Sequence, residues 1–258
     1  MKLQLLPSTI ETNGEPSGRQ HLTCFVIDDT VAVDAGSLAM AASRLQREQV
    51  RDVILTHSHL DHIAGLPLFI DDLFATLEEP VTVYGTGPVI DALERDIFNW
   101  SIYPRFSELS NATGPVLAYK NFRPGEEFTV RHLTFRAIEV NHRVPCVGFV
   151  IADSRTSIAL SGDTAEMDGF WDLVNKVPKI SAILVECAFP DELEELAEIS
   201  HHLTPSRLRL ELEKCSRTDC PVYVVNLKPM YRDSIIQQLT EIGRPNLEAL
   251  KVGHVYEW

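Results

Sequence analysis

The sequence has few cysteines, and none of them form a C-x-x-C pair. The five are odd in number and scattered along the chain, at Cys24, Cys146, Cys187, Cys215 and Cys220. This pattern does not fit a disulfide framework or a paired-cysteine metal site. We therefore expect the thiols to be reduced and mostly buried, in a cytoplasmic protein.

Long apolar runs and linkers are also missing. No stretch is long enough to span a bilayer, and the N-terminal MKLQLLPSTIETNG lacks the basic and apolar regions of a signal peptide. There is no Gly/Ser/Pro-rich linker, low-complexity tract or solenoid repeat. With 45% hydrophobic residues, which is ample for a core, the 258 residues are predicted to form a single domain over 1–258 with no membrane partner.

Basic residues are scarce relative to acidic ones. The chain has 23 Lys and Arg against 37 Asp and Glu, a formal charge of −14. A protein that coats a nucleic-acid polymer usually needs a basic face, so we expect no such partner. A small anionic substrate stays compatible with this charge, because bound divalent cations would reverse the local field.

Apolar patterns alternate between strand-like and helix-like stretches in two rounds. The first round has strands at 21–27 and 31–35, a helix at 38–48, a strand that ends at residue 56 and a helix at 63–79. A strand at 81–85, a helix at 88–98 and a less regular aromatic segment at 97–110 follow. The second has strands at 126–140, 147–153, 157–163, 181–189 and 221–227, with helices at 168–177, after 203 and at 229–242. This order predicts an α/β fold with two mixed sheets flanked by helices.

The segment THSHLDH places His57, His59, Asp61 and His62 within six residues. It follows the buried-strand pattern DVILT and precedes a helical pattern, so it lies on a strand-to-helix turn. Imidazole and carboxylate donors suit Zn²⁺, and also Mn or Fe. On such a turn His57 and His59 can face one ion while Asp61 and His62 serve a second, so we predict a two-metal site.

Two later residues complete this prediction. His142 follows the strand FRAIEV, where it can be the third nitrogen ligand of the first ion. Asp163 ends the buried strand of ALSGDT, and its two oxygens can bridge both ions. The alternatives are a packed or surface histidine and a helix N-cap.

The combination H-x-H-x-D-H, a histidine after a strand, and SGDT resembles the metallo-β-lactamase superfamily. NHRVPCVGFVI, VECAFPDELEELAEISHHLTP, NLKPMY and HSHLDHIAGLP are further similar to class II 3′,5′-cyclic-nucleotide phosphodiesterases, over nearly the whole chain. The resemblance implies an αββα sandwich and hydrolysis of a phosphodiester such as that of cAMP or cGMP by a metal-bridged hydroxide. It also favours a homodimer.

The resemblance further implies roles for His202 and Glu186. By analogy with tRNA-processing zinc phosphodiesterases, His202 protonates the leaving oxygen or stabilises the transition state, and Glu186 orients it. Asp61, a ligand of the second ion, is counted with them as catalytic. The alternatives are that His202 only precedes the helix that Thr204 begins and that backbone N–H groups satisfy Glu186.

Asn226 departs from the family pattern, which has a histidine as the last ligand of the second ion. An amide oxygen is a poorer donor to Zn²⁺ than imidazole, so the second ion should bind weakly or be a harder cation such as Mn²⁺. Two alternatives are that His201 replaces the missing ligand or that Asn226 inactivates the site.

Other residues are candidates for substrate contacts. Lys228 and Arg143 are the nearest cations for the phosphate. Trp100, Tyr103 and Phe106 lie in an aromatic segment that can stack on a base or pack as core or lid.

Rival functions remain open. They are a lactonase or thioesterase of the same fold, such as a glyoxalase II, and a slow-turnover nucleotide-binding protein with a weakened second metal site. A tRNA-processing nuclease is disfavoured by the acidic balance and by the lack of a basic glycine-rich arm.

Overall fold

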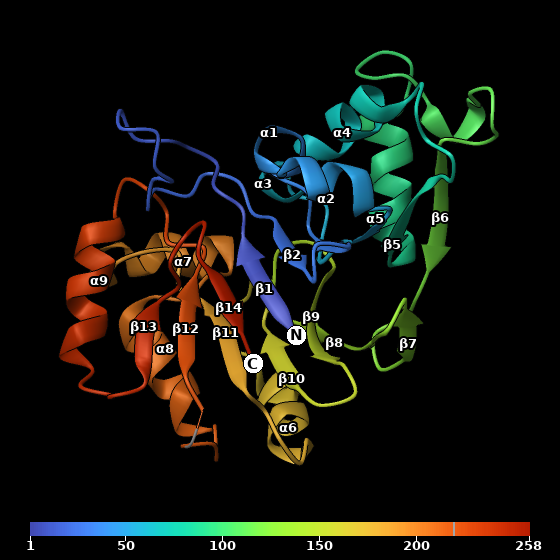
Figure 1. Ribbon diagram of the computed structural model, residues 1–258. Coiled ribbons are helices and arrows are strands. Elements are labelled where there is room, and N and C mark those ends of the chain that lie inside the picture. The colour runs from blue at the N-terminus through green and yellow to red at the C-terminus, as the bar shows by residue number, and fades with distance from the viewer. Residues whose placement is uncertain (219) are drawn as a thin grey trace. The chain divides into compact units, whose positions relative to one another are not determined.

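The computed structural model describes residues 1–218 and 220–258 (Figure 1). Contacts divide the chain into two compact units, each built on one seven-stranded mixed sheet. The first unit comprises Met1–Arg123 with Val252–Glu257, and the second Pro124–Lys251 with Trp258. Among the described residues, no helix has both the length and the apolar character needed to cross a bilayer.

The sheet of the first unit runs in the order β14-β1-β2-β3-β4-β5-β6. Its strands are β1 (Lys2–Leu5), β2 (Phe25–Ile27), β3 (Val31–Val33), β4 (Asp52–Ile54), β5 (Val81–Gly85), β6 (Leu117–Asn121) and β14 (Val255–Glu257). Strands β3 to β6 pair in parallel, whereas β14, β1, β2 and β3 pair antiparallel. The loop after β4 therefore leaves from the carboxyl edge of the parallel part, where α/β proteins usually place their sites.

Short helices connect these parallel strands. They are α1 (Leu38–Ala41), α2 (Arg44–Gln49), α3 (Leu60–Ile63), α4 (Gly65–Leu73) and α5 (Gly87–Ala92), with a π-helical turn at Leu93–Ile97 and a 3-10 turn at Phe106–Glu108. Helix α4 buries Leu66, Phe69 and Ile70, spaced as one helical face, in a core that also holds Val53 of β4 and Val83 of β5. This packing fixes the helix that follows the histidine motif.

The sheet of the second unit runs in the order β13-β12-β11-β10-β9-β8-β7. Its strands are β7 (Glu127–Val130), β8 (Leu133–Val140), β9 (Cys146–Ala152), β10 (Ser157–Leu160), β11 (Ala182–Glu186), β12 (Val222–Val225) and β13 (Leu247–Ala249). Strands β7 to β10 pair antiparallel and β10 to β13 in parallel. The carboxyl ends of β10, β11 and β12 thus lie at one edge of this sheet.

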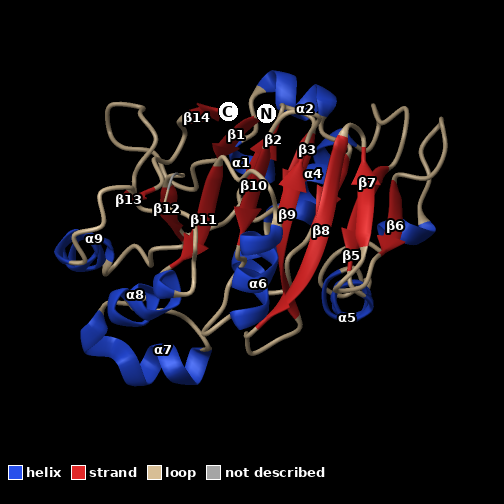
Figure 2. Cartoon of the chain, turned by 90° about the horizontal axis from the view of Figure 1, so that it is seen from below, coloured by secondary structure: helices blue, strands red, loops and turns tan. Residues whose placement is uncertain are grey.

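The helices of the second unit are α6 (Asp168–Lys176), α7 (Glu194–Ser200), α8 (Pro205–Glu213) and α9 (Arg232–Glu241), with a 3-10 turn at Asp191–Leu193. Helix α6 crosses β8 and β9 (Figure 2) and buries Phe170, Trp171 and Val174. Helices α8 and α9 contribute Leu208 and Ile235 to the same core. The helices expected at 168–177, after 203 and at 229–242 correspond to α6, α8 and α9, whereas α7 and β13 are not among the expected elements.

Several expected boundaries differ. The helix expected at 38–48 is two helices, because Ser43 accepts the backbone N–H of Gln46, while the side chain of Gln46 accepts that of Ser43, and this capping box begins α2. The helix expected at 63–79 ends at Leu73, and the strand expected at 21–27 begins only at Phe25. The helix expected at 88–98 changes into the π-helical turn after Ala92.

The fold class is nevertheless the expected one, since both sheets are mixed and helices flank them. All five cysteines are buried and lie outside any disulfide, as the scattered cysteines predicted. The prediction of one domain stays a prediction.

Candidate metal centre

The histidine motif lies on the turn between β4 and α3. The strand ends at Ile54, and His59, whose own backbone is extended, is the N-cap of α3. Asp61 and His62 lie in the first turn of α3. The expected strand-to-helix turn is therefore present, and the four side chains leave from consecutive parts of it.

The three imidazoles of the motif lie against one another. The ring centroid of His57 is 4.7 Å from that of His59 and 4.1 Å from that of His62. His57 and His62 are buried, whereas His59 and Asp61 are half-buried. Within the first unit, the structure thus gathers the imidazole donors of the motif at one place.

Asp34, which our sequence analysis missed, orders two of these rings. It follows β3 with a left-handed backbone (φ 61°) and is 1% exposed. Its carboxylate accepts the backbone N–H of Thr56 (2.8 Å), the Thr56 hydroxyl (2.9 and 3.0 Å) and Nδ1 of His62 (2.7 Å). Because the Thr56 hydroxyl donates to Asp34, it accepts from Nδ1 of His57, 2.9 Å away. Asp34 therefore fixes Nδ1 of both rings as the protonated nitrogen, so that Nε2 is the nitrogen that could donate to a metal.

Backbone contacts hold the same turn. The N–H of Thr23 donates to the carbonyl of Asp61 (2.8 Å), and the N–H of Ala35 donates to that of His62 (2.7 Å). Gly36 lies so close that a Cβ there would be 2.0 Å from the Asp61 carbonyl oxygen. The glycine is required by this approach, and it explains the sequence DAGS after β3.

A second donor set lies in the second unit. His142 follows β8, Asp163 follows β10, and His202 lies between α7 and α8. One donor atom from each lies within 4.8 Å of the others. The predicted ligands His142 and Asp163 and the predicted acid His202 are thus brought together, and that both donor sets serve one centre stays a prediction.

His202 is held by Glu186 at the end of β11. Nδ1 of His202 lies 2.8 Å from Oε1 of Glu186, which also accepts the backbone N–H of Thr164 (3.1 Å). Burial lowers the pKa of His202, but the charge and hydrogen bond of Glu186 outweigh it and leave the pKa above its usual value. Burial raises the pKa of Glu186, and His202 counteracts this. Glu186 thus contacts both a backbone N–H and the imidazole, and its role in orienting a catalytic His202 stays a prediction.

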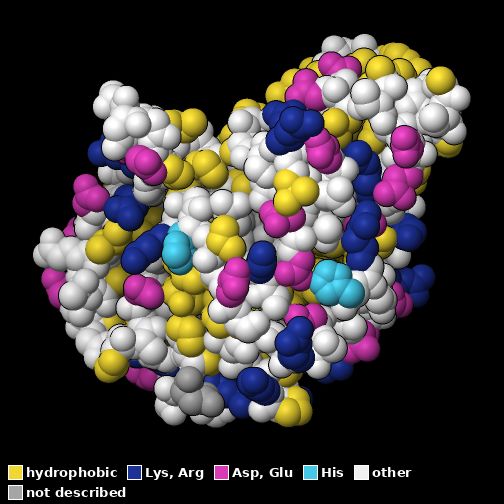
Figure 3. Space-filling view, in the orientation of Figure 1, with side chains coloured by type: hydrophobic (Ala, Val, Ile, Leu, Met, Phe, Trp, Pro, Cys, Tyr) yellow, Lys and Arg dark blue, Asp and Glu magenta, His cyan; other side chains and the backbone are white. Residues whose placement is uncertain are grey.

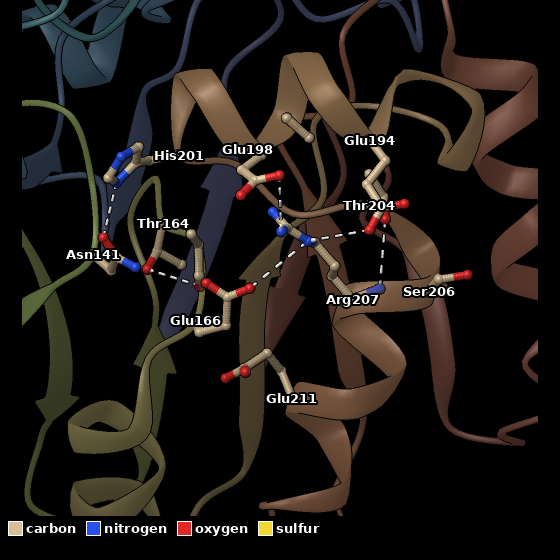
Figure 4. Close-up of polar contacts among 12 residues, drawn as sticks. Asn141, Thr164, Glu166, Glu194, Glu198, His201, Thr204, Ser206, Arg207 and Glu211 are labelled. Atoms are coloured by element: carbon tan, nitrogen blue, oxygen red, sulfur yellow. Dashed lines mark hydrogen bonds and ion pairs between the residues drawn. The ribbon is translucent and has the colours of Figure 1, made fainter.

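His201 ends α7 in a left-handed conformation (φ 56°). Its carbonyl lies 3.1 Å from Nδ1 of His142, and its own Nδ1 lies 2.9 Å from Oδ1 of Asn141 (Figure 4). Arg207 of α8 lies nearby with carboxylates of Glu166, Glu194 and Glu198 at 3.7–3.9 Å (Figure 4). The backbone of His201 thus orients His142. The ion pairs of Arg207 connect α8 to α7 and to Glu166, which follows Asp163 in the chain.

Asn226 follows β12 with a left-handed backbone (φ 58°). Its Nδ2 donates a 2.9 Å hydrogen bond to Oδ1 of Asp163. The residue that departs from the family pattern therefore contacts the expected bridging ligand through its NH₂ group. Its own role as a ligand stays a prediction.

The other candidates divide between the units. Lys228 is half-buried. Its positive charge opposes the effect of Glu186 and by itself lowers the pKa of His202. Arg143 is exposed beside His142. In the first unit, Phe106 is 1% exposed in the core with Tyr103 packed on it, whereas Trp100 is 57% exposed. Phe106 therefore serves core packing, and of these three aromatic residues only Trp100 is exposed.

The donor chemistry fits a divalent metal. Three of the histidines predicted as ligands (His57, His62 and His142) have Nδ1 within hydrogen-bond distance of a hydroxyl, a carboxylate and a carbonyl, respectively. Ligating histidines are characteristically held in this way, with Nε2 turned to the ion. Nitrogen and carboxylate oxygen donors suit Zn, Mn or Fe.

A family model described as a beta-lactamase superfamily domain matches residues 29–216. A probable 3′,5′-cyclic-nucleotide phosphodiesterase of Yersinia pestis is 24% identical over 231 residues, covering 81% of this chain and 64% of the relative. The chain thus spans somewhat less than two thirds of that relative. A nuclear ribonuclease Z of Triticum aestivum is 29% identical over 134 residues, covering 51% of this chain and 69% of the relative.

Solved structures show the fold. A metallo-β-lactamase fold protein from Bacillus subtilis matches with a TM-score of 0.76 at 18% identity, over 100% of this chain and 99% of its own. Unliganded yeast PDE1 matches with a TM-score of 0.78 at 18% identity, over 98% of both chains. The expected metallo-β-lactamase fold is confirmed.

Proposed function

Because the chain belongs to the beta-lactamase superfamily, we propose that it is a metal-dependent phosphodiesterase that hydrolyses 3′,5′-cyclic nucleotides or a related small phosphodiester. The relative from Yersinia pestis supports this substrate class. The second donor set supports it too, because the predicted ligands His142 and Asp163 lie beside the predicted acid His202. The proposal covers the reaction type and the size of the substrate.

Two divalent ions are part of the proposal. His57, His59 and His142 would hold the first, Asp61 and His62 the second, and Asp163 both. Bound ions of this kind make hydroxide available near neutral pH and neutralise charge on phosphoryl oxygens. Lys228 and Arg143 would contact the phosphate.

The observation that carries the proposal is the His202–Glu186 pair beside the donors of His142 and Asp163. A ribose 3′-oxygen leaves as an alkoxide and needs a proton, whereas a thiolate leaves without one. Glu186 holds Nδ1 of His202, so that Nε2 is the nitrogen that can give this proton. A fixed acid beside metal donors favours a phosphodiester over a thioester.

The test measures Zn, Mn and Fe per chain and the rates on cAMP, cGMP and bis(p-nitrophenyl) phosphate, with and without added Mn²⁺. We expect metal-dependent hydrolysis of a cyclic nucleotide. His202→Asn should lower kcat by about 10²–10⁴-fold while leaving metal content unchanged. Bound metal without turnover of any phosphodiester would refute the proposal, and turnover of a lactone or thioester instead would identify the rival hydrolase.

A tRNA-processing activity is the second candidate, favoured by the ribonuclease Z relative. The net charge of −14 argues against it, and Lys and Arg are interspersed with Asp and Glu on the face drawn in Figure 3. Cleavage of a precursor tRNA faster than of cAMP would favour this candidate.

A further inference from the structure

Asn226 stands where an additional metal ligand would be expected, yet its contact is with Asp163. We propose that Asn226 is a positioning residue: its NH₂ group holds the Asp163 carboxylate for the metal, and its oxygen is not a ligand. This inference rests on the metal binding in the proposed function. It concerns residues of the second unit only.

The contact itself points to this role. Nδ2 of Asn226 is 2.9 Å from Oδ1 of Asp163, a normal length for a hydrogen bond to a carboxylate. An NH₂ group donates and cannot coordinate a cation, so the atom turned toward Asp163 is the one that metal binding cannot use. The bond engages Oδ1 and sets the plane of the carboxylate. Oδ2 is then the better donor, and this single oxygen, rather than one oxygen for each ion, would serve both ions of the proposed function.

The backbone supports the same assignment. Asn226 has φ 58°, a conformation in which asparagine is several-fold enriched. It directly follows β12, whose pairing with β11 continues to Val225 opposite Glu186. A rigid strand end therefore aims the amide, as is needed for a group that orients a neighbouring ligand.

The surroundings of Asp163 favour the same role. It is 3% exposed, and it follows Gly162, whose φ is 66°. Its neighbours His142 and His202 each have Nδ1 within hydrogen-bond distance of an acceptor. The acceptors fix the orientation of the imidazoles of His142 and His202, and Asn226 fixes the orientation of the Asp163 carboxylate in the same way.

The experiment titrates the protein of 258 residues with Zn²⁺ against a chromophoric chelator and records the optical spectrum of the Co²⁺-substituted protein. For Asn226→Ala we expect a loss in affinity of about 10–100-fold, the usual effect of removing a residue that orients a ligand. At saturating Co²⁺ the band positions and intensities should equal those of the wild type, because the ligands are unchanged. Asn175→Ala is the control, since it deletes an amide of the same unit that bonds Ser216 and the Lys214 carbonyl.

Two results would overturn the inference. A changed Co²⁺ spectrum at saturation in Asn226→Ala would mean that the amide oxygen is a ligand. An unchanged Zn²⁺ affinity would mean that the bond to Asp163 does not matter for the metal. Failure of the wild type to bind Zn²⁺ or Co²⁺ would refute the inference together with the metal binding on which it rests, whereas binding without phosphodiesterase activity would refute the proposed function alone.

Discussion

Asp34→Asn should lower both the stability of the metal-free protein and its affinity for Zn²⁺. The carboxylate of Asp34 only accepts: one oxygen takes the N–H of Thr56, and the other takes Nδ1–H of His62. An amide of the same shape has one acceptor and one donor. In one orientation its NH₂ group faces Nδ1–H of His62, and in the other it faces the N–H of Thr56.

The size of each effect follows from these contacts. Either orientation replaces a hydrogen bond to a charged group by two opposed donors, which should lower the free energy of unfolding of the metal-free protein by about 1.5–3 kcal/mol. In the first orientation the clash between the two donors is removed when the proton of His62 moves from Nδ1 to Nε2. Nε2 then has no lone pair for a metal. Zn²⁺ affinity should therefore fall by about 10–100-fold.

Urea denaturation of the metal-free protein measures the first effect, and competition with a chromophoric chelator measures the second. Asp29→Asn is the matched control, because Asp29 accepts a 3.0 Å hydrogen bond from the Gln46 side chain rather than from a residue of the motif. The reasoning is refuted when Asp34→Asn binds Zn²⁺ as tightly as the wild type. A loss of affinity of the same size in Asp29→Asn would refute it equally.

Three further outcomes are expected. Gly36→Ala should cost about 3 kcal/mol of stability or more, because its Cβ would lie 2.0 Å from the Asp61 carbonyl, whereas Gly87→Ala meets only an ordinary 3.5 Å contact and should be nearly neutral in the same thermal melt. Lys228→Ala should raise KM for cAMP about tenfold, the effect of losing one hydrogen bond to a charged group, and unchanged steady-state kinetics would exclude a phosphate contact. Removal of metal by a chelator should lower the melting temperature, and Zn²⁺ but not Ca²⁺ should restore it, since calcium prefers oxygen ligands.

The sequence alone was sufficient to predict the motif and the main strands. Strands such as β5 and β8 were predictable because their buried side chains alternate or run continuously within a few residues. Strand β1 was not predicted, because it pairs with β14 at the opposite end of the chain, where Lys2 opposes Glu257. Local periodicity carries no information on such a pairing.

Helix boundaries illustrate the same limit. The apolar pattern of 38–48 is continuous, yet Ser43 begins a new helix by capping Gln46. Helix α7 was missed because its first turn is acidic and it buries only Ala197. Capping and partial burial depend on tertiary contacts that a hydrophobic pattern does not contain.

The candidate site shows why ligands are easier to predict than the residues that hold them. A metal ligand must be an imidazole, thiolate or oxygen donor, so His57, His59, Asp61 and His62 stand out by residue type and spacing. The group that fixes Nδ1 needs only to accept a hydrogen bond, and here a hydroxyl, carboxylates and a backbone carbonyl all do so. The backbone carbonyl of His201 has no residue-type signal at all, and Asp34 has only its place after a buried strand and before Ala-Gly. The orientation of the ligands is therefore a property of the strand ends that the fold brings together, and it becomes visible only when the fold is known.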